Sequence, residues 1–170
     1  MSVKKQNKLK SYRDKMVETR QRSLDFFEGI DFRYENLGSL NGCTVINDSR
    51  SLDLEGTLES LTIINTPVHL ILGDTDAQKL NDILGTEIRR KVVTLGMFGK
   101  NDITKRFDVL NLVDRAVYGK KMDEVVLQMI PWLKPGETLL FSPGSSNENF
   151  DDFIVSGTYF NSLVGPYINK

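Results

Sequence analysis

The strongest constraint on the fold is an uninterrupted apolar run at residues 68–72, Val-His-Leu-Ile-Leu, which stops at Gly73-Asp74. Continuous runs of this kind are typical of strands that lie inside a parallel sheet, because both faces of such a strand must be apolar. Parallel neighbours in a sheet are joined by crossover connections, which are usually helices. The run therefore predicts an α/β fold in which helices cover both faces of the sheet.

Strand and helix patterns alternate along most of the chain. The expected strands are residues 32–38, 44–47, 68–72, 91–95, 117–118 and 138–142. The expected helices are residues 9–27, 53–65, 77–84, 101–112, 123–129 and 149–164, with Asp53 and Asp123 as N-caps. This order predicts a Rossmann-like three-layer αβα sandwich with a mainly parallel sheet of about six strands, preceded by an N-terminal helix.

A length of 170 residues with 39% apolar content indicates one folded domain, which we place at residues 29–170. Residues 1–28 are expected to form a basic amphipathic helix, because the first 22 residues hold eight Lys or Arg against Asp14 and Glu18. A basic arm can meet nucleic acid or an anionic membrane. Tyr12 is the only aromatic residue among those 22, which favours a solvated helix face over a nucleic-acid contact.

Several classes of protein are excluded by what the sequence lacks. A single cysteine, Cys43, allows no internal disulfide and no cysteine metal cluster. No apolar run reaches the roughly 18 residues of a membrane span, and no signal core follows the basic start, so a cytoplasmic location is expected. The one histidine, His69, lies inside an apolar strand, where a core imidazole is favoured over a catalytic base or a metal ligand.

The sequence also lacks the motifs that bind nucleotides or form acyl-serine intermediates. Residues 96–100, Gly-Met-Phe-Gly-Lys, are too short for a P-loop, and residues 119–121, Gly-Lys-Lys, lack its first glycine and its hydroxyl. No G-x-G-x-x-G follows a strand, and neither G-x-S-x-G nor a histidine accompanies the serines after residue 141. The chain is therefore expected to bind no ATP and no Mg²⁺ on its own.

Two strands that are a hundred residues apart both end in small polar residues, Asn-Asp-Ser at 47–49 and Ser-Pro-Gly-Ser-Ser at 142–146. Ligands of open α/β sheets bind at the carboxyl ends of strands, so one site is predicted there. The amides and hydroxyls of Gly144, Ser145 and Asn147, ahead of a helix, are suited to a carboxylate or a phosphate, although a plain turn fits equally well. Asp48 has a similar alternative, since it can hold loop amides or simply pair with Arg33.

Three separated motifs carry a resemblance to a known family. Residues 26–35, F-F-E-G-I-D-F-R-Y-E, are similar to F-x-G-x-x-H-R-x-E, and residues 47–53, N-D-S-R-S-L-D, are similar to N-D-S-K-A-T-N. Residues 142–153, S-P-G-S-S-N-E-N-F-D-D-F, resemble S-P-A-C-A-S-x-D-Q-F-x-x-F with one residue deleted, and Gly157 with Phe160 matches R-G-x-x-F. Over residues 24–164 the chain thus resembles the C-terminal domain of the Mur peptide ligases, most closely those that add D-glutamate.

The resemblance implies roles for individual residues. Arg33 and Asp48 match residues that face the nucleotide, and Ser146 and Phe153 match residues that bind the incoming amino acid. Arg50 stands where the family has the lysine of K-A-T and is expected to meet a carboxylate. Other positions depart from the family: Leu52 replaces the threonine, Phe32 replaces the histidine and Ser156 replaces an arginine. Asp74 and Asp76 lie where a lysine is expected, which disfavours D-glutamate itself. An acidic amino acid or another small anion is the expected ligand.

The resemblance further implies a part in ATP-dependent amide-bond formation during peptidoglycan synthesis. The family's P-loop ATPase domain and its UDP-sugar-binding domain are not in this sequence, so ATP and Mg²⁺ are expected only with a separate ligase partner. This domain would position the amino acid and close over the nucleotide. The alternative is a degenerate, non-catalytic module that binds a ligand or a protein, and Leu52 with the Asp74 and Asp76 pair favours it. A nucleic-acid binder rests on the first 22 residues alone.

Overall fold

The computed structural model describes residues 22, 24–73, 75, 82–99, 107–145 and 152–168. Its strands are β1 (Glu35–Leu40), β2 (Cys43–Asn47), β3 (Val68–Leu72), β4 (Val92–Phe98), β5 (Ala116–Gly119) and β6 (Thr138–Phe141). Its helices are α2 (Leu54–Ile63), α3 (Asp82–Lys91), α4 (Phe107–Leu110), α5 (Met122–Met129) and α6 (Phe153–Val164), with short 3₁₀ turns η3 (Ile130–Trp132) and η4 (Gly165–Tyr167).

The six strands form one sheet in the order β1-β2-β6-β3-β4-β5. All neighbouring pairs are parallel except β1 and β2, which form an antiparallel hairpin. Asn41 and Gly42 connect the hairpin with φ angles of 52° and 79°, the left-handed backbone that a tight two-residue hairpin turn requires. The predicted six-stranded, mainly parallel α/β sheet is therefore confirmed.

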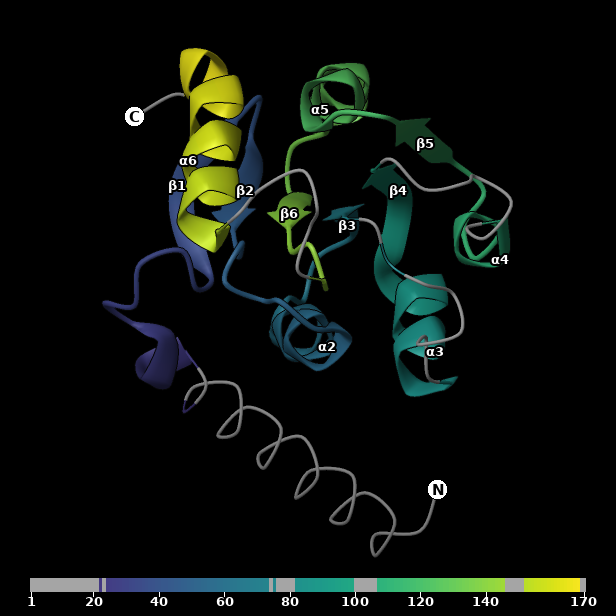
Figure 1. The fold of residues 1–170 in the computed structure, drawn as a ribbon, viewed down its shortest axis with the longest axis horizontal. Coiled ribbons are helices and arrows are strands. Elements are labelled where there is room, and N and C mark those ends of the chain that lie inside the picture. Colours follow the sequence, from purple (N-terminus) through teal and green to yellow (C-terminus); the bar gives the residue numbers. More distant parts are fainter. Residues whose placement is uncertain are drawn as a thin grey trace, which may run out of the picture.

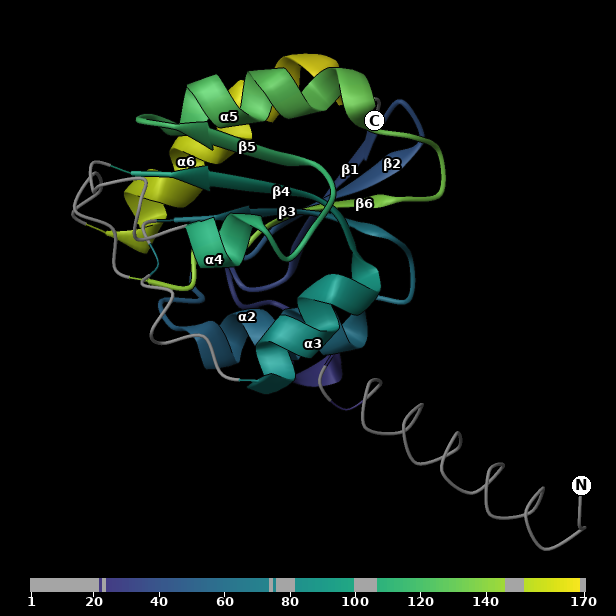
Figure 2. The same cartoon turned by 90° about the vertical axis from the view of Figure 1, so that its right-hand side faces the viewer.

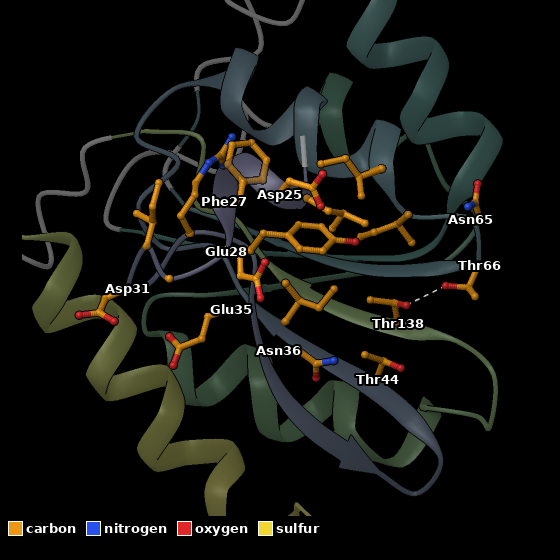
Figure 3. Close-up of a pocket in the computed structure, with 18 residues that line it drawn as sticks. Asp25, Phe27, Glu28, Asp31, Glu35, Asn36, Thr44, Asn65, Thr66 and Thr138 are labelled. Atoms are coloured by element: carbon orange, nitrogen blue, oxygen red, sulfur yellow. Dashed lines mark hydrogen bonds between the residues drawn. The ribbon is translucent and has the colours of Figure 1, made fainter. Parts of the chain in front are cut away.

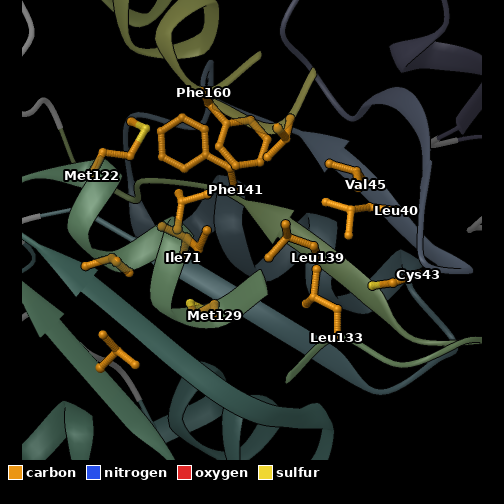
Figure 4. Close-up of a cluster of buried hydrophobic side chains, with 14 of the residues drawn as sticks. Leu40, Cys43, Val45, Ile71, Met122, Met129, Leu133, Leu139, Phe141 and Phe160 are labelled. Atoms are coloured by element: carbon orange, nitrogen blue, oxygen red, sulfur yellow. The ribbon is translucent and has the colours of Figure 1, made fainter. Parts of the chain in front are cut away.

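Helices cover both faces of the sheet, as the apolar run of β3 predicts (Figures 1 and 2). Helices α5 and α6 lie on one face, and α2 and α3 lie on the other. Between the sheet and α5 and α6, the rings of Phe141 and Phe160 stack with centroids 4.9 Å apart (Figure 4). On the other face of the sheet, a second cluster of buried apolar residues packs the strands against α2, α3 and α4. It includes Leu61, Leu70 and Ile88.

Lys91 is a buried polar residue that joins two helices of the second face. Its Nζ donates hydrogen bonds to the carbonyl oxygens of Leu61, Thr62 and Ile64 at the end of α2. The last carbonyls of a helix have no partner within the helix, so a cation from the next helix both satisfies them and complements the helix dipole. Lys91 therefore holds the end of α2 against the end of α3.

Replacing Lys91 by Met is expected to lower the free energy of unfolding by about 1.5 kcal/mol, because buried carbonyls lose their donors while the apolar stem is kept. Urea denaturation followed by circular dichroism measures the change. Arg89→Met, on the same turn but exposed, is the matched control. Equal stability of Lys91→Met and the control would show that the α2 carbonyls do not need this ammonium.

Two strand and helix boundaries differ from the sequence-based expectation for identifiable reasons. The first strand begins at Glu35 and not at residue 32, because Phe32 and Tyr34 have φ angles of 62° and 51°, which no strand residue adopts. Helix α3 continues to Lys91, whereas residues 77–84 were expected as the helix and residue 91 as the start of a strand. Lys91 remains helical because its side chain reaches the end of α2.

The two predicted N-caps have different outcomes. Asp53 is the N-cap of α2, where its side chain accepts a hydrogen bond from the Gly56 amide at 2.8 Å. Asp123 is not an N-cap, because α5 begins one residue earlier and Lys121 occupies the cap position. The Glu124 carboxylate accepts the amides of Lys120 and Lys121 instead, which completes the start of the helix without an aspartate cap.

The remaining expectations are confirmed within a few residues, where the structure describes them. Strands β2, β3, β5 and β6 lie within the predicted segments or one residue beyond them. Most of the predicted helix 9–27, and the first residues of the helices at 77–84, 101–112 and 149–164, lie outside the described residues. No helix in the described part of the chain is long and apolar enough to cross a membrane.

Candidate functional site

The carboxyl ends of β2 and β6 lie side by side, as the sequence predicts. Asn47 is the register partner of Phe141, and the amide of Asp48 donates a hydrogen bond to the carbonyl of Phe141 at 2.7 Å. The Asn-Asp-Ser motif of β2 therefore meets the Ser-Pro-Gly-Ser segment of β6. Two motifs that are almost a hundred residues apart in the sequence therefore meet at the carboxyl ends of these strands, where Asn47, Asp48 and Ser142 are buried.

Asp48 is the hub of a buried polar network at this edge. Its Oδ2 accepts hydrogen bonds from the hydroxyls of Ser51 at 2.7 Å, Ser60 at 2.7 Å and Ser142 at 2.9 Å. Its Oδ1 accepts the Arg33 guanidinium at 2.7 Å and the Tyr34 amide at 3.0 Å. The residue is 0% exposed, so its carboxylate is enclosed by donors from four parts of the chain.

Arg33 leaves the network toward the surface. Its Nη1 pairs with Asp48 and its Nη2 pairs with Glu59 at 2.7 Å, while its guanidinium lies 4.2 Å from the centre of the Phe27 ring. Arg33 and Asp48 therefore meet, and the pairing that the sequence analysis left open is formed. A contact of either residue with a nucleotide stays a prediction, and for Asp48 it requires the network to open.

Two other side chains, Tyr34 and Cys43, have raised pKa values, and a third, His69, is paired. Burial, with a smaller contribution from Asp48, raises the pKa of Tyr34 to about 12. Burial raises the pKa of Cys43 to about 11, so this thiol stays protonated at neutral pH and is no nucleophile. His69 lies buried within β3, and its Nε2 is 2.6 Å from an oxygen of Glu137, which confirms the predicted core position.

Arg50 and Phe153, both assigned to the amino acid by sequence, are in contact. The Arg50 guanidinium carbon lies 4.9 Å from the centre of the Phe153 ring, and the Phe32 ring packs edge-on against the same ring at 6.3 Å. Among the described residues, none forms a hydrogen bond or ion pair with the Arg50 side chain. The guanidinium thus lies over an aromatic ring, and no described residue accepts a hydrogen bond from its N–H donors.

The loop after β6 offers fewer amides than the sequence analysis expects. The Gly144 amide donates a hydrogen bond to the Ser51 carbonyl at 3.0 Å, and Gly144 has a φ of 63°. The Ser145 hydroxyl is buried, with no hydrogen-bond partner in the described part of the chain. Ser146 and Asn147 lie outside the described residues, as do Asp74 and Asp76. Anion binding at this loop therefore stays a prediction, and the Gly144 amide cannot take part in it because it is already hydrogen-bonded.

A cavity of about 340 Å³ opens between the start of α2 and residues 26–33. Arg50, Leu52 and Phe26 lie on its wall, and we call it the Arg50 pocket. Its charged and apolar lining includes Phe26, Ile30, Arg50, Leu52, Glu55 and Glu59. Arg50 and Leu52 occupy matched motif positions and were singled out from the sequence, whereas Phe26 and Glu55 occupy none and were missed. An apolar residue that stays exposed, such as Phe26, is visible only in the structure.

A larger cavity of about 710 Å³ lies between residues 24–36, β2 and the end of α2 (Figure 3). Four acidic residues line it: Asp25, Glu28, Asp31 and Glu35. Its lining also includes Thr44 and Thr138, at the amino ends of β2 and β6, so it extends away from the strand ends. Within the described ranges, no group of three or more His, Cys, Asp or Glu side chains could hold a metal ion.

Comparison with known proteins identifies relatives that share most of this chain. No family model matches. The chain is 33% identical over 140 residues to a Chlorobium phaeobacteroides protein and 30% identical over 151 residues to one from Bdellovibrio bacteriovorus, both named UDP-N-acetylmuramoylalanine--D-glutamate ligase. These matches cover 81% and 88% of this chain but 30% and 32% of the relatives. The chain thus spans about a third of their length.

A solved structure shares the fold. It is a Haemophilus ducreyi domain assigned to a UDP-N-acetylmuramate:L-alanyl-gamma-D-glutamyl-medo-diaminopimelate ligase, with a TM-score of 0.52 and 17% identity. The similarity covers 79% of this chain and 99% of that domain. The motif order, the sequence relatives and the shared fold agree. This chain is homologous to the C-terminal domain of the Mur ligases.

Proposed function

We propose that the chain acts as the C-terminal domain of a Mur-type, ATP-dependent peptide ligase, with residues 29–170 as that domain and residues 1–28 leading into it. The observation that carries the proposal is the union of the two strand-end motifs. Ser142 of one motif donates a hydrogen bond to Asp48 of the other, and the Arg50 and Phe153 pair lies beside them. The segments that resemble the family therefore meet at the carboxyl ends of β2 and β6, where ligands of open α/β sheets bind.

In this role the chain supplies binding groups and a separate protein supplies the phosphate chemistry. Arg50, Phe153 and Ser146 bind the amino acid, and Arg33 faces the nucleotide. A P-loop partner in the cytoplasm holds ATP, Mg²⁺ and the UDP-sugar substrate of peptidoglycan synthesis. The carboxylate to be extended becomes an acyl phosphate there, and the amine of the amino acid displaces the phosphate.

The chain alone is expected to hydrolyse no ATP, because it has no loop that can wrap the β- and γ-phosphates or hold Mg²⁺ against them. Phosphate release is measured with purified chain, ATP and Mg²⁺. Turnover that follows the chain through purification, and that requires Mg²⁺, would contradict this expectation.

The ligase role itself is tested by complementation. The Bdellovibrio bacteriovorus relative is shortened by its C-terminal third, and this chain is added back with a panel of amino acids. Amino-acid-dependent phosphate release that requires both proteins supports the proposed function. Release that is the same with and without this chain, although the unshortened relative is active, counts against it.

The second candidate function is a binding module without catalysis. Leu52 favours it, because this exposed leucine stands where the family has a hydrogen-bonding threonine. The closed network around Asp48 favours it as well, since a saturated carboxylate contributes to stability without contacting a ligand. A chain that binds an amino acid but never restores phosphate release would support the module over the ligase.

A further inference from the structure

We propose that the Arg50 pocket binds an α-amino acid with an apolar side chain, such as leucine or phenylalanine, and disfavours glutamate. This inference rests on the proposed function, which gives the domain an amino acid to hold, and it names the class of that amino acid. Three features of the pocket carry it: a guanidinium that pairs with none of the described residues, an apolar wall that is exposed to solvent and an acidic side chain at the start of α2.

Arg50 provides the anchor for the α-carboxylate. Its guanidinium is held against the Phe153 ring at 4.9 Å, which orients the planar group and leaves its N–H donors accessible. The neighbouring guanidinium of Arg33 is already engaged by Asp48 and Glu59. Of the two arginines on the pocket wall, Arg50 is therefore the one available to form a two-point contact with a carboxylate.

The apolar wall selects the side chain. Phe26 is 72% exposed and Leu52 is 45% exposed, although both line a cavity. Apolar side chains that are left open to water inside a concave site gain free energy when a ligand covers them. A volume of about 340 Å³ accommodates an amino acid of the size of leucine or phenylalanine.

The acidic side of the pocket accounts for the ammonium group and for the exclusion of glutamate. Three carboxylates line the pocket, and two are committed: Asp53 caps α2 and Glu59 pairs with Arg33. Glu55 pairs with none of the described residues and can accept the α-ammonium. A second carboxylate on the ligand would face Leu52 and these acids, and would meet repulsion and desolvation, because Arg33, the other arginine that lines the pocket, is already paired.

Calorimetric titration of the full chain tests the class of ligand. Both L-leucine and D-leucine are expected to bind with dissociation constants at least about tenfold lower than that of D-glutamate. Two analogues separate the contributions of the charges: 4-methylpentanoate lacks the ammonium and 3-methylbutylamine lacks the carboxylate. Each is expected to bind about tenfold more weakly than leucine.

Variants test the location. Arg50→Gln is expected to weaken leucine binding at least about tenfold, and Leu52→Thr is expected to narrow the preference over D-glutamate. Arg115→Gln is the matched control, because Arg115 also lies over an aromatic ring, Trp132 at 5.0 Å, but at the amino end of β5. The control is expected to bind leucine as the unaltered chain does.

The outcomes separate this inference from the proposed function. Preference for D-glutamate, or leucine binding that Arg50→Gln leaves unchanged, overturns the pocket assignment, while the ligase role still stands on the complementation assay. No binding of any amino acid, together with phosphate release that still depends on the chain, also overturns the pocket alone. Failure of both assays overturns both proposals.

Discussion

Asp48→Asn is expected to lower the free energy of unfolding by about 3–5 kcal/mol, the usual loss when one partner of a buried ion pair is removed. The substitution keeps the volume of the side chain but replaces one acceptor oxygen by an NH₂ donor. Because the two carboxylate oxygens accept five hydrogen bonds, at least one hydroxyl or the Arg33 guanidinium then faces another donor. Urea denaturation followed by circular dichroism gives the value.

The matched control is Glu59→Gln, which removes the other carboxylate that pairs with Arg33. The Glu59 side chain is 62% exposed, so this loss is expected to stay below about 1 kcal/mol. Equal losses in the two variants would show that the Asp48 network contributes no more to stability than a surface ion pair. The contrast also bears on function, because a network that must stay closed for stability leaves Asp48 unable to contact a nucleotide.

Two members of this network, Arg33 and Asp48, were identified from the sequence, but the serine hydroxyls that complete it were not. The resemblance singled out Arg33 and Asp48, and a pairing of the two was one of the alternatives that the sequence left open. The hydroxyls of Ser51 and Ser60 were missed, although Ser60 occupies a buried position next to Leu61 on α2. A serine at a core-facing helical position signals a buried acceptor nearby, but only the packing of α2 on β2 shows which acceptor it is.

The ends of a strand or helix were predictable from the sequence wherever residues of that local segment determine them. Strand β3 has the bounds that its apolar run predicts, since Gly73 ends that run. Prediction was wrong where tertiary contacts determine the boundary. The helical state of Lys91 depends on carbonyls of α2, and the delayed start of β1 depends on left-handed backbone at Phe32 and Tyr34. No local sequence pattern predicts the contact of Lys91 with α2 or the left-handed backbone at Phe32 and Tyr34.

The Arg50 pocket shows the same division between local and tertiary information. The resemblance predicted that Arg50 and Phe153 share a subsite, and the structure brings them into contact. It did not predict that Phe26, which is far from both in the sequence, lines a cavity together with Arg50. The class of ligand therefore follows from residues that fall outside the matched motif positions.

Gly157→Ala is expected to lower the free energy of unfolding by about 2–3 kcal/mol, near the upper end of overpacking effects. An added Cβ would lie 2.3 Å from the Ser49 hydroxyl and 2.5 Å from the Phe32 ring. Neither neighbour can move easily, because Ser49, two residues after the end of β2, is buried, and Phe32 packs against Phe153. The clash outweighs the gain of about 1 kcal/mol that alanine brings to a helix interior.

Gly165→Ala, just after the same helix, is the control, since an added Cβ there has no atom within 4 Å. This variant is expected to be as stable as the unaltered chain, within about 0.5 kcal/mol. Because Phe32 supports the ring of Phe153 that holds Arg50, Gly157→Ala is also expected to weaken leucine binding, whereas Gly165→Ala is not. A Gly157→Ala chain that keeps full stability and full affinity would mean that Phe32 moves aside freely, and that the platform beneath Arg50 does not depend on the close approach of α6 to the end of β2.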